Sequence, residues 1–147
     1  LTNKLKIKKN IQGLARNIRY KLLSKFCYKK NIKIILTAHN LEDQVETFFI
    51  RLSRGSGLTG LSAMKPLSNL DKNLKICRPL LAINKKELIK ISKKKFGKYF
   101  KDPSNIDRKY LRTKIRSLQK PLKQCGIEYN QIIRSINTSG FFKGIAE

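Results

Sequence analysis

The stretch LTAHNLEDQVETFFIRLSRGSGLTGL, residues 36–61, gathers side chains that can do chemistry. It holds the single histidine of the chain, His39, and three of its nine acidic residues, with Asp43 four positions further on. A carboxylate near a histidine can bind a magnesium ion or orient a general base. Asp43, Thr47 and Arg51 also repeat at helical spacing, as a solvated polar face would. The pattern alone therefore leaves a catalytic and a structural interpretation of His39 and Asp43 equally open.

A glycine-spaced loop, RGSGLTG, follows this stretch. Glycines at 55, 57 and 60 let a backbone approach a ligand closely, and Arg51 and Arg54 border them, as in a phosphate-binding turn. The loop lacks the GxxxxGK[ST] pattern, and short glycine loops also end helices. Either function fits the loop.

Alternating helices and strands are predicted to position these residues. Apolar residues repeat at helical spacing from 11 to about 30, NIKIILTAH follows as a short β-branched strand, and helical spacing returns from Leu41. LKICRPLL, ended by Pro79, is a second strand, and Asn84 with Glu87 predicts a capped helix that stops at Gly97. This order indicates the α/β class, with a Rossmann-like parallel sheet and flanking helices.

In such a sheet, His39 is expected at the carboxyl end of a strand, the edge at which ligands collect. Glu42 and Asp43 then fall in the first turn of the next helix. A carboxylate there complements the helix dipole, and for Glu42 we expect this capping role.

The remaining chain is predicted to be helical. One helix runs from about 107 to 119 and is closed by Pro121, and a second covers residues 127–137 and is broken by Ser139 and Gly140. We accordingly expect one domain over residues 1–120 and the start of a helical region over 121–147. Arginines at 108, 112 and 116 lie at i, i+4 and i+8 beside the apolar stripe, where they can bind phosphate or brace the helix against nearby Asp102 and Asp107.

Charge and cysteine usage narrow the class of protein. The chain carries 34 basic and 9 acidic residues, a net charge of +25, which favours a polyanionic partner such as RNA. Lysine outnumbers arginine 25 to 9, so part of this charge can reflect a general preference for lysine. Cysteines 27, 77 and 125 form no CxxC pair and fit a reducing cytoplasm, and no segment is apolar enough to predict a membrane protein.

Several motifs occur in an order that resembles a known family. AHNLEDQVETFFIRLSRGSGLTGLSAM, RPLL and KDPSNIDRKYLRTKIR, with QGLARNIRY upstream, are similar to the tRNA(Ile)-lysidine synthetase family of N-type ATP pyrophosphatases. The resemblance covers residues 12–116 and implies that residues 1–120 form a partial catalytic domain of this family. It implies an adenine nucleotide alpha-hydrolase-like fold and an enzyme that adenylates the wobble cytidine of an isoleucine tRNA and joins lysine to it. ATP, Mg²⁺, tRNA(Ile) and free L-lysine are then the expected ligands, and a homodimer is compatible with it.

The resemblance also assigns residues. It places His39 and Asp43 at the nucleotide and magnesium site, with His39 as a candidate base. The residues that it implies for contacts with ATP or tRNA phosphates are Arg19, Arg54, Gly55, Ser56, Gly57, Arg112 and Arg116.

The chain departs from the family pattern as well. Asn40 replaces a second histidine, Glu42 an aspartate and Thr113 an asparagine, and the family's Ser-Gly-Gly-x-Asp-Ser loop for ATP is missing. We therefore expect that this polypeptide alone does not adenylate RNA. Two alternatives stay open: a related tRNA-thiolating ATP pyrophosphatase, disfavoured by the scattered cysteines, and a non-catalytic basic RNA-binding module.

Overall fold

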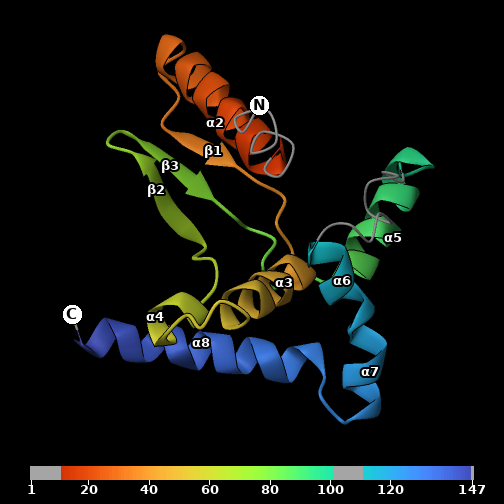
Figure 1. The fold of residues 1–147 in the computed structure, drawn as a ribbon. Helices are drawn as coiled ribbons and strands as arrows, with labels where there is room; N and C mark the ends of the chain where they lie inside the picture. The colour runs from red at the N-terminus through yellow and green to blue at the C-terminus, as the bar shows by residue number, and fades with distance from the viewer. Residues whose placement is uncertain (1–10, 101–110, 147) are drawn as a thin grey trace, which may run out of the picture. The chain divides into compact units, whose positions relative to one another are not determined.

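The computed structural model describes residues 11–100 and 111–146, which form two compact units. The sheet unit comprises described residues 11–36 and 67–77. The helical unit comprises described residues 37–66, 78–100 and 111–146. Each unit is described separately, and their elements are drawn in Figure 1.

The sheet unit consists of one helix and three strands: α2 (Ile11–Lys29), β1 (Ile34–Leu36), β2 (Leu67–Asp71) and β3 (Leu74–Cys77). The strand order is β1-β3-β2. Strands β1 and β3 pair in parallel, with Ile35 opposite Ile76, and β2 pairs antiparallel with β3. The α/β class and the parallel pairing of the two predicted strands are thus confirmed, but the sheet is mixed.

Strand β2 was not predicted, because its polar residues give the sequence no strand-like apolar pattern. Its burial alternates along LSNLD, as in a half-buried edge strand, but Ser68, Asn69 and Asp71 give it little apolar pattern. Asp71 also accepts a hydrogen bond from the hydroxyl of Tyr28, at 2.8 Å, which ties the hairpin to α2.

The predicted helix over residues 11–30 is present as α2, but its apolar stripe is largely exposed. Leu14, Ile18, Leu22 and Phe26 are between 48% and 63% exposed. The buried apolar residues of this unit are Cys27, Leu74 and Ile76.

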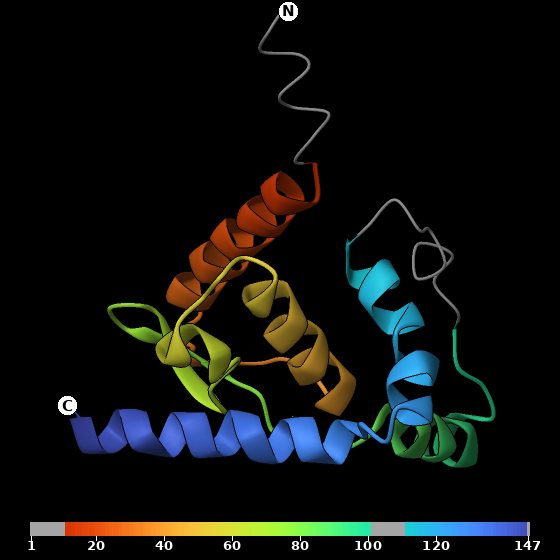
Figure 2. The same cartoon turned by 60° about the horizontal axis from the view of Figure 1, so that its bottom comes forward.

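The helical unit contains α3 (Leu41–Leu52), α4 (Leu58–Leu61), α5 (Lys85–Phe96), α6 (Leu111–Ser117), α7 (Gln119–Gln124) and α8 (Tyr129–Ala146). Helix α8 runs along α3 and α4, as Figures 1 and 2 show from two directions. A cluster of buried apolar side chains holds this unit together. It consists of Val45 of α3, Ala63, and Ile132 and Ile136 of α8. The apolar period of α3 therefore faces α8, which leaves its polar residues for other contacts.

Of two predicted helix ends, one is met and one was wrong: α6 ends at Ser117, close to the predicted residue 119. Pro121 lies inside the first turn of α7, where a missing N–H is tolerated; its ring is incompatible with the carbonyl of Ser117, the residue at which α6 ends. Ser139 and Gly140 do not break α8, which continues to Ala146. A glycine costs a helix about 1 kcal/mol relative to alanine, too little to end one that packs on α3 and α4.

Other expectations are met or fall outside the described residues. Helix α5 begins after Asn84 and ends at Gly97, whose φ of 70° is left-handed, as predicted. The predicted helix start at residue 107 falls outside the described residues, as do Asp102, Asp107 and Arg108. The domain boundary at residue 120 stays a prediction. In the described part of the chain, no helix has the length and apolar character that crossing a membrane requires.

Candidate functional site

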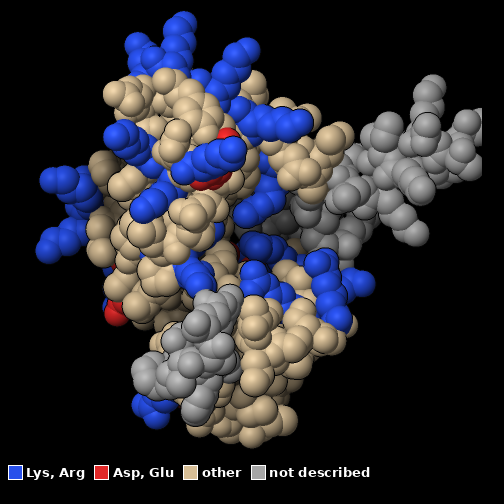
Figure 3. Space-filling model, turned by 90° about the vertical axis from the view of Figure 1, so that its left-hand side faces the viewer, with Lys and Arg blue, Asp and Glu red and all other residues tan. Residues whose placement is uncertain are grey.

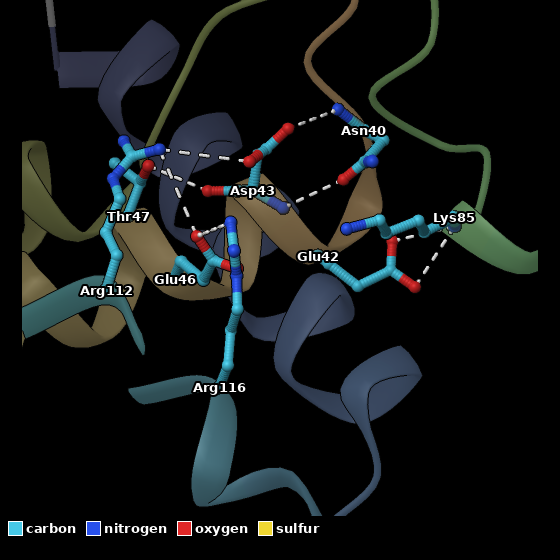
Figure 4. A network of polar contacts seen from close by, with 8 residues as sticks. All are labelled: Asn40, Glu42, Asp43, Glu46, Thr47, Lys85, Arg112 and Arg116. Atoms are coloured by element: carbon cyan, nitrogen blue, oxygen red, sulfur yellow. Dashed lines mark hydrogen bonds and ion pairs between the residues drawn. The ribbon is translucent and has the colours of Figure 1, made fainter. Parts of the chain in front are cut away.

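Asp43 lies in the first turn of α3 and closes a reciprocal capping box. Its carboxylate Oδ2 accepts a hydrogen bond from the backbone N–H of Asn40 at 3.0 Å, and Asn40 Oδ1 accepts one from the backbone N–H of Asp43 at 3.1 Å (Figure 4). The extended backbone of Asn40 is typical of an N-cap residue. Asp43 thus has a structural function, and its second oxygen, Oδ1, faces Arg112 of α6.

Glu42 caps a helix, but not its own. Both oxygens of its carboxylate accept a hydrogen bond from the backbone N–H of Lys85, at 2.9 and 3.1 Å, at the start of α5. Glu42 was predicted to cap the helix on which it lies, α3, and it caps α5 instead. Glu42 therefore fixes the N-terminus of α5 against the N-terminus of α3.

Two arginines of α6 face the carboxylates of α3 (Figure 4). Arg116 donates from Nε and Nη2 to the two oxygens of Glu46, a side chain that is only 1% exposed. Arg112 Nη1 lies 3.8 Å from Asp43 Oδ1 and 4.0 Å from Glu46 Oε2. The predicted bracing of this helix is thus present in Arg116, but its partner is Glu46 on α3.

Burial governs the protonation of Glu46. Desolvation raises the pKa of its carboxyl above the usual value, and the hydrogen bonds from Arg116 pull that pKa back only in part. The same pair raises the pKa of the Arg116 guanidinium, which stays charged. The guanidinium of Arg116 is already bound to Glu46. Arg112, whose side chain is 42% exposed, is therefore better suited to bind phosphate.

A second set of polar side chains, buried or half-buried, shapes the loop after α3. Gln44 exchanges two hydrogen bonds of 2.8 Å with the backbone of Met64, through its side-chain amide nitrogen and oxygen. Arg51 donates to the carbonyls of Gly60 and Ala63 at 2.6 and 2.8 Å. Arg78 donates to the carbonyl of Lys65 at 2.8 Å. Arg51 is therefore a support of the loop, although it borders the glycines as a phosphate ligand would.

The glycine loop itself ends α3. The Gly55 N–H donates to the Leu52 carbonyl and the Ser56 N–H to the Arg51 carbonyl, the pair of bonds that defines a Schellman motif. Gly55 has a φ of 68°, which a residue with a Cβ rarely adopts. These two amides are used inside the turn, so a phosphate here would depend on the exposed side chain of Arg54 and on Gly57, which precedes α4.

His39 is half-buried one residue before the N-cap of α3. Its Nδ1 lies 2.9 Å from the hydroxyl of Thr37, a contact that can orient the ring. Arg19 is exposed on α2 of the sheet unit and is not placed relative to these residues. Among residues 11–100 and 111–146, no group of three or more His, Cys, Asp or Glu side chains is arranged to hold a metal ion. A magnesium ion at Asp43 would thus need most of its ligands from phosphates and water, which is usual for this ion.

A pocket lies over the start of α3 and contains charges of both signs. Its carboxylates are those of Glu42, Asp43 and Glu46, and its cations are Lys85, Lys86 and Arg116. Ile89 and Tyr129 add an apolar part to the wall. Burial raises the pKa of the Tyr129 hydroxyl, which keeps it neutral at physiological pH. Such a pocket suits a small molecule that carries both an ammonium and a carboxylate group.

Sequence reasoning missed Gln44, Glu46 and Arg78, which are all buried polar residues. Glu46 gave one usable signal, because it is an acidic residue, scarce in this chain, next to the apolar position Val45. Gln44 and Arg78 contact backbone atoms of residues distant in sequence, and no local pattern indicates such contacts.

The fold and the site define the class of protein. Residues 2–122 match the family described as the PP-loop domain, and the chain belongs to this family. It is 21% identical to the U34-tRNA thiolase NcsA from Methanococcus maripaludis, solved with its [4Fe-4S] cluster, with a TM-score of 0.65 over 86% of this chain and 42% of that one. At this identity the likeness concerns the fold.

Three relatives that are similar in sequence carry one name, tRNA(Ile)-lysidine synthase. The chain is 48% identical over 117 residues to that of Wolbachia pipientis, covering 80% of this chain and 27% of the relative. It is 44% identical over 113 residues to that of Orientia tsutsugamushi (77% and 25%) and 39% identical over 135 residues to that of Anaplasma marginale (92% and 28%). The chain thus spans about a quarter of the length of these curated relatives.

Proposed function

We propose that this chain forms part of the active site of a tRNA(Ile)-lysidine synthase, an ATP-dependent ligase that joins lysine to the wobble cytidine of tRNA(Ile). The observation that supports this most directly is the cluster at the start of α3. There the buried Glu46–Arg116 pair holds α6 against α3 and brings Asp43 within 3.8 Å of Arg112. The name of the relatives supplies the tRNA and the product, lysidine, and the family resemblance supplies the rest of the reaction.

The cluster suits the charges that this reaction develops. Adenylation of the base and loss of AMP both place negative charge on phosphate, which arginines stabilise. Arg112 and Arg54 are the exposed candidates, and Asp43 Oδ1 is the oxygen that can bind Mg²⁺ together with phosphate oxygens. Bound Mg²⁺ would neutralise part of the phosphate charge.

The mixed-charge pocket is our proposed site for free lysine. Glu42 can accept hydrogen bonds from an ammonium group beside the one from the Lys85 backbone N–H, while the Lys85 and Lys86 side chains can pair with a carboxylate. The attacking amine must lose a proton, and His39 stays our candidate for the general base. The reaction would take place in the cytoplasm, and a homodimer stays a prediction.

An RNA partner is also supported by the surface of the protein. Lys and Arg side chains are numerous on the face drawn in Figure 3, and Asp and Glu side chains are few. This charge suits tRNA and would equally suit a non-catalytic RNA-binding module, which is the second candidate function. The assay below separates the two.

The proposal predicts lysidine formation once the ATP-binding loop is supplied. We would join the chain to the N-terminal segment of the Wolbachia pipientis relative and incubate it with ATP, lysine and a tRNA(Ile) transcript. Mass analysis of the digested nucleosides should show lysidine only when lysine is present, and the 147-residue chain by itself should give none. RNA binding without lysidine or ATP–pyrophosphate exchange would support the binding module instead.

A second prediction concerns Arg112. Arg112→Ala should weaken tRNA binding and reduce the slope of log K against log salt by about 1, because one phosphate contact is lost. Lys114→Ala removes an equal charge from the exposed side of the same helix and should have the smaller effect. Filter binding over a range of salt concentrations measures both, and equal effects would show that Arg112 contributes only general charge.

A further inference from the structure

Two phenylalanines are exposed among lysines at the C-terminal end of α5. Phe96 is 71% exposed and Phe100 is 87% exposed, the two largest exposures among the large apolar side chains of the described residues. Lys93, Lys94, Lys95 and Lys98 lie between or beside them in sequence. We call these six residues the α5 platform.

The backbone of the platform is held in place. Gly97, with a φ of 70°, donates from its N–H to the Lys93 carbonyl at 2.9 Å and ends α5. The hydroxyl of Ser92 then donates to the carbonyl of Lys98 at 3.0 Å. Lys98 Nζ lies 5.5 Å from the centre of the Phe100 ring, and Lys93 Nζ lies 5.7 Å from that of Tyr99. Cations and aromatic faces are thus presented together.

The charge of the α5 platform is positive and is not balanced by nearby carboxylates. Within the part of the chain that the structure describes, no carboxylate forms an ion pair with the platform lysines. The one acidic residue of α5, Glu87, lies in its first turn, at the other end of the helix. An exposed aromatic pair with uncompensated lysines is complementary to a ligand that has both flat rings and negative charge.

We propose that the α5 platform binds unpaired nucleotides of an RNA, with Phe96 and Phe100 stacking on bases and the lysines contacting phosphates. Single-stranded nucleic acid offers free base faces and a charged backbone, and proteins that bind it combine aromatic side chains with a basic surface. The inference rests on the proposed function only for the identity of the RNA, an unpaired region of tRNA. A membrane is the less suitable partner because the apolar residues Leu88 and Ile89 of α5 are partly buried and leave no continuous apolar face.

The chain contains no tryptophan, which gives a direct test. In the full 147-residue protein, Phe100→Trp places a single indole on the platform. We would titrate it with an oligouridylate of about twelve nucleotides, a length in the range of known single-strand sites. Heparin, a duplex RNA of the same length, and vesicles of phosphatidylcholine with phosphatidylserine are the comparison ligands.

Stacking should quench the tryptophan with the oligouridylate and leave it nearly unchanged with heparin, which has charge but no bases. In filter binding, which needs no tryptophan, Phe96→Ala and Phe100→Ala should each lower the affinity for the oligonucleotide about fivefold or more, with the salt slope unchanged. Ile91→Ala, a 60% exposed aliphatic residue on the same helix, is the matched control and should not change the affinity.

Equal responses to heparin and oligouridylate, a response to vesicles alone, or unchanged affinity in both alanine variants would each overturn the proposal. The assay needs neither ATP nor lysine. Oligonucleotide binding as described, together with no lysidine from the chain joined to the ATP-binding segment, would therefore disprove the proposed function and leave this inference intact.

Discussion

Asp43→Ala is expected to lower the rate of lysidine formation by about a hundredfold or more, in the chain joined to the ATP-binding segment of the Wolbachia relative. Loss of one charged or hydrogen-bonding group at a site where charge develops typically has an effect of this order. Asp43 Oδ2 is engaged by the N–H of Asn40, so the change removes Oδ1, the oxygen that faces Arg112 and that we propose for Mg²⁺.

The same change removes half of a capping box, so a structural effect must be separated from a chemical one. Loss of the cap alone costs about 1 kcal/mol of stability. Asp43→Asn keeps an oxygen that can accept from the Asn40 N–H but has no charge, and is the matched variant. If Asp43→Asn unfolds at the temperature of the unchanged protein but is as inactive as Asp43→Ala, the charge is required. Full activity of Asp43→Asn would refute the role in metal binding.

Local features of this site could be predicted from the sequence. The apolar period placed α3, and Asn84 and Gly97 placed both ends of α5, because caps and turns depend on residues within a few positions. Neighbouring residues alone could not decide the function of the glycine loop. A Schellman motif and a phosphate-binding turn both require glycine, and only the hydrogen bonds of Gly55 and Ser56 show that the loop ends α3.

Contacts between distant residues could not be predicted. Glu46 and Arg116 are 70 positions apart, and Glu42 and Lys85 are 43 apart, so nothing in a local window pairs them. Arg51 illustrates the consequence. Its position beside the glycines suggested phosphate, whereas its guanidinium donates to two carbonyls of the folded loop. In this chain an arginine's function depends on which carboxylate or carbonyl the fold brings to it.

Arg116→Ala is expected to lower the free energy of unfolding by about 3 kcal/mol at neutral pH. Breaking a buried ion pair by removing one partner typically costs about 3–5 kcal/mol, and the lower end applies because the Arg116 side chain is 32% exposed. The cost arises at Glu46, which is 1% exposed and would be left without the partner that donates to both its oxygens. Urea denaturation followed by circular dichroism measures it, with the exposed Arg134→Ala on α8 as the control for loss of one positive charge.

The dependence of that loss on pH identifies Glu46 as its origin. Burial already raises the pKa of Glu46, and removal of Arg116 takes away the main influence that lowers it. A carboxyl with a raised pKa binds its proton more tightly in the folded state, so its contribution to stability falls as pH rises from the unfolded pKa through the folded pKa. The destabilisation by Arg116→Ala should therefore grow as pH rises through the raised pKa of Glu46, and be smaller at a mildly acidic pH than at neutral pH. In a protein that already carries Glu46→Gln, the destabilisation by Arg116→Ala should be small and nearly independent of pH. A loss of equal size at both pH values and in both backgrounds would show that Arg116 stabilises the protein by packing and not through Glu46.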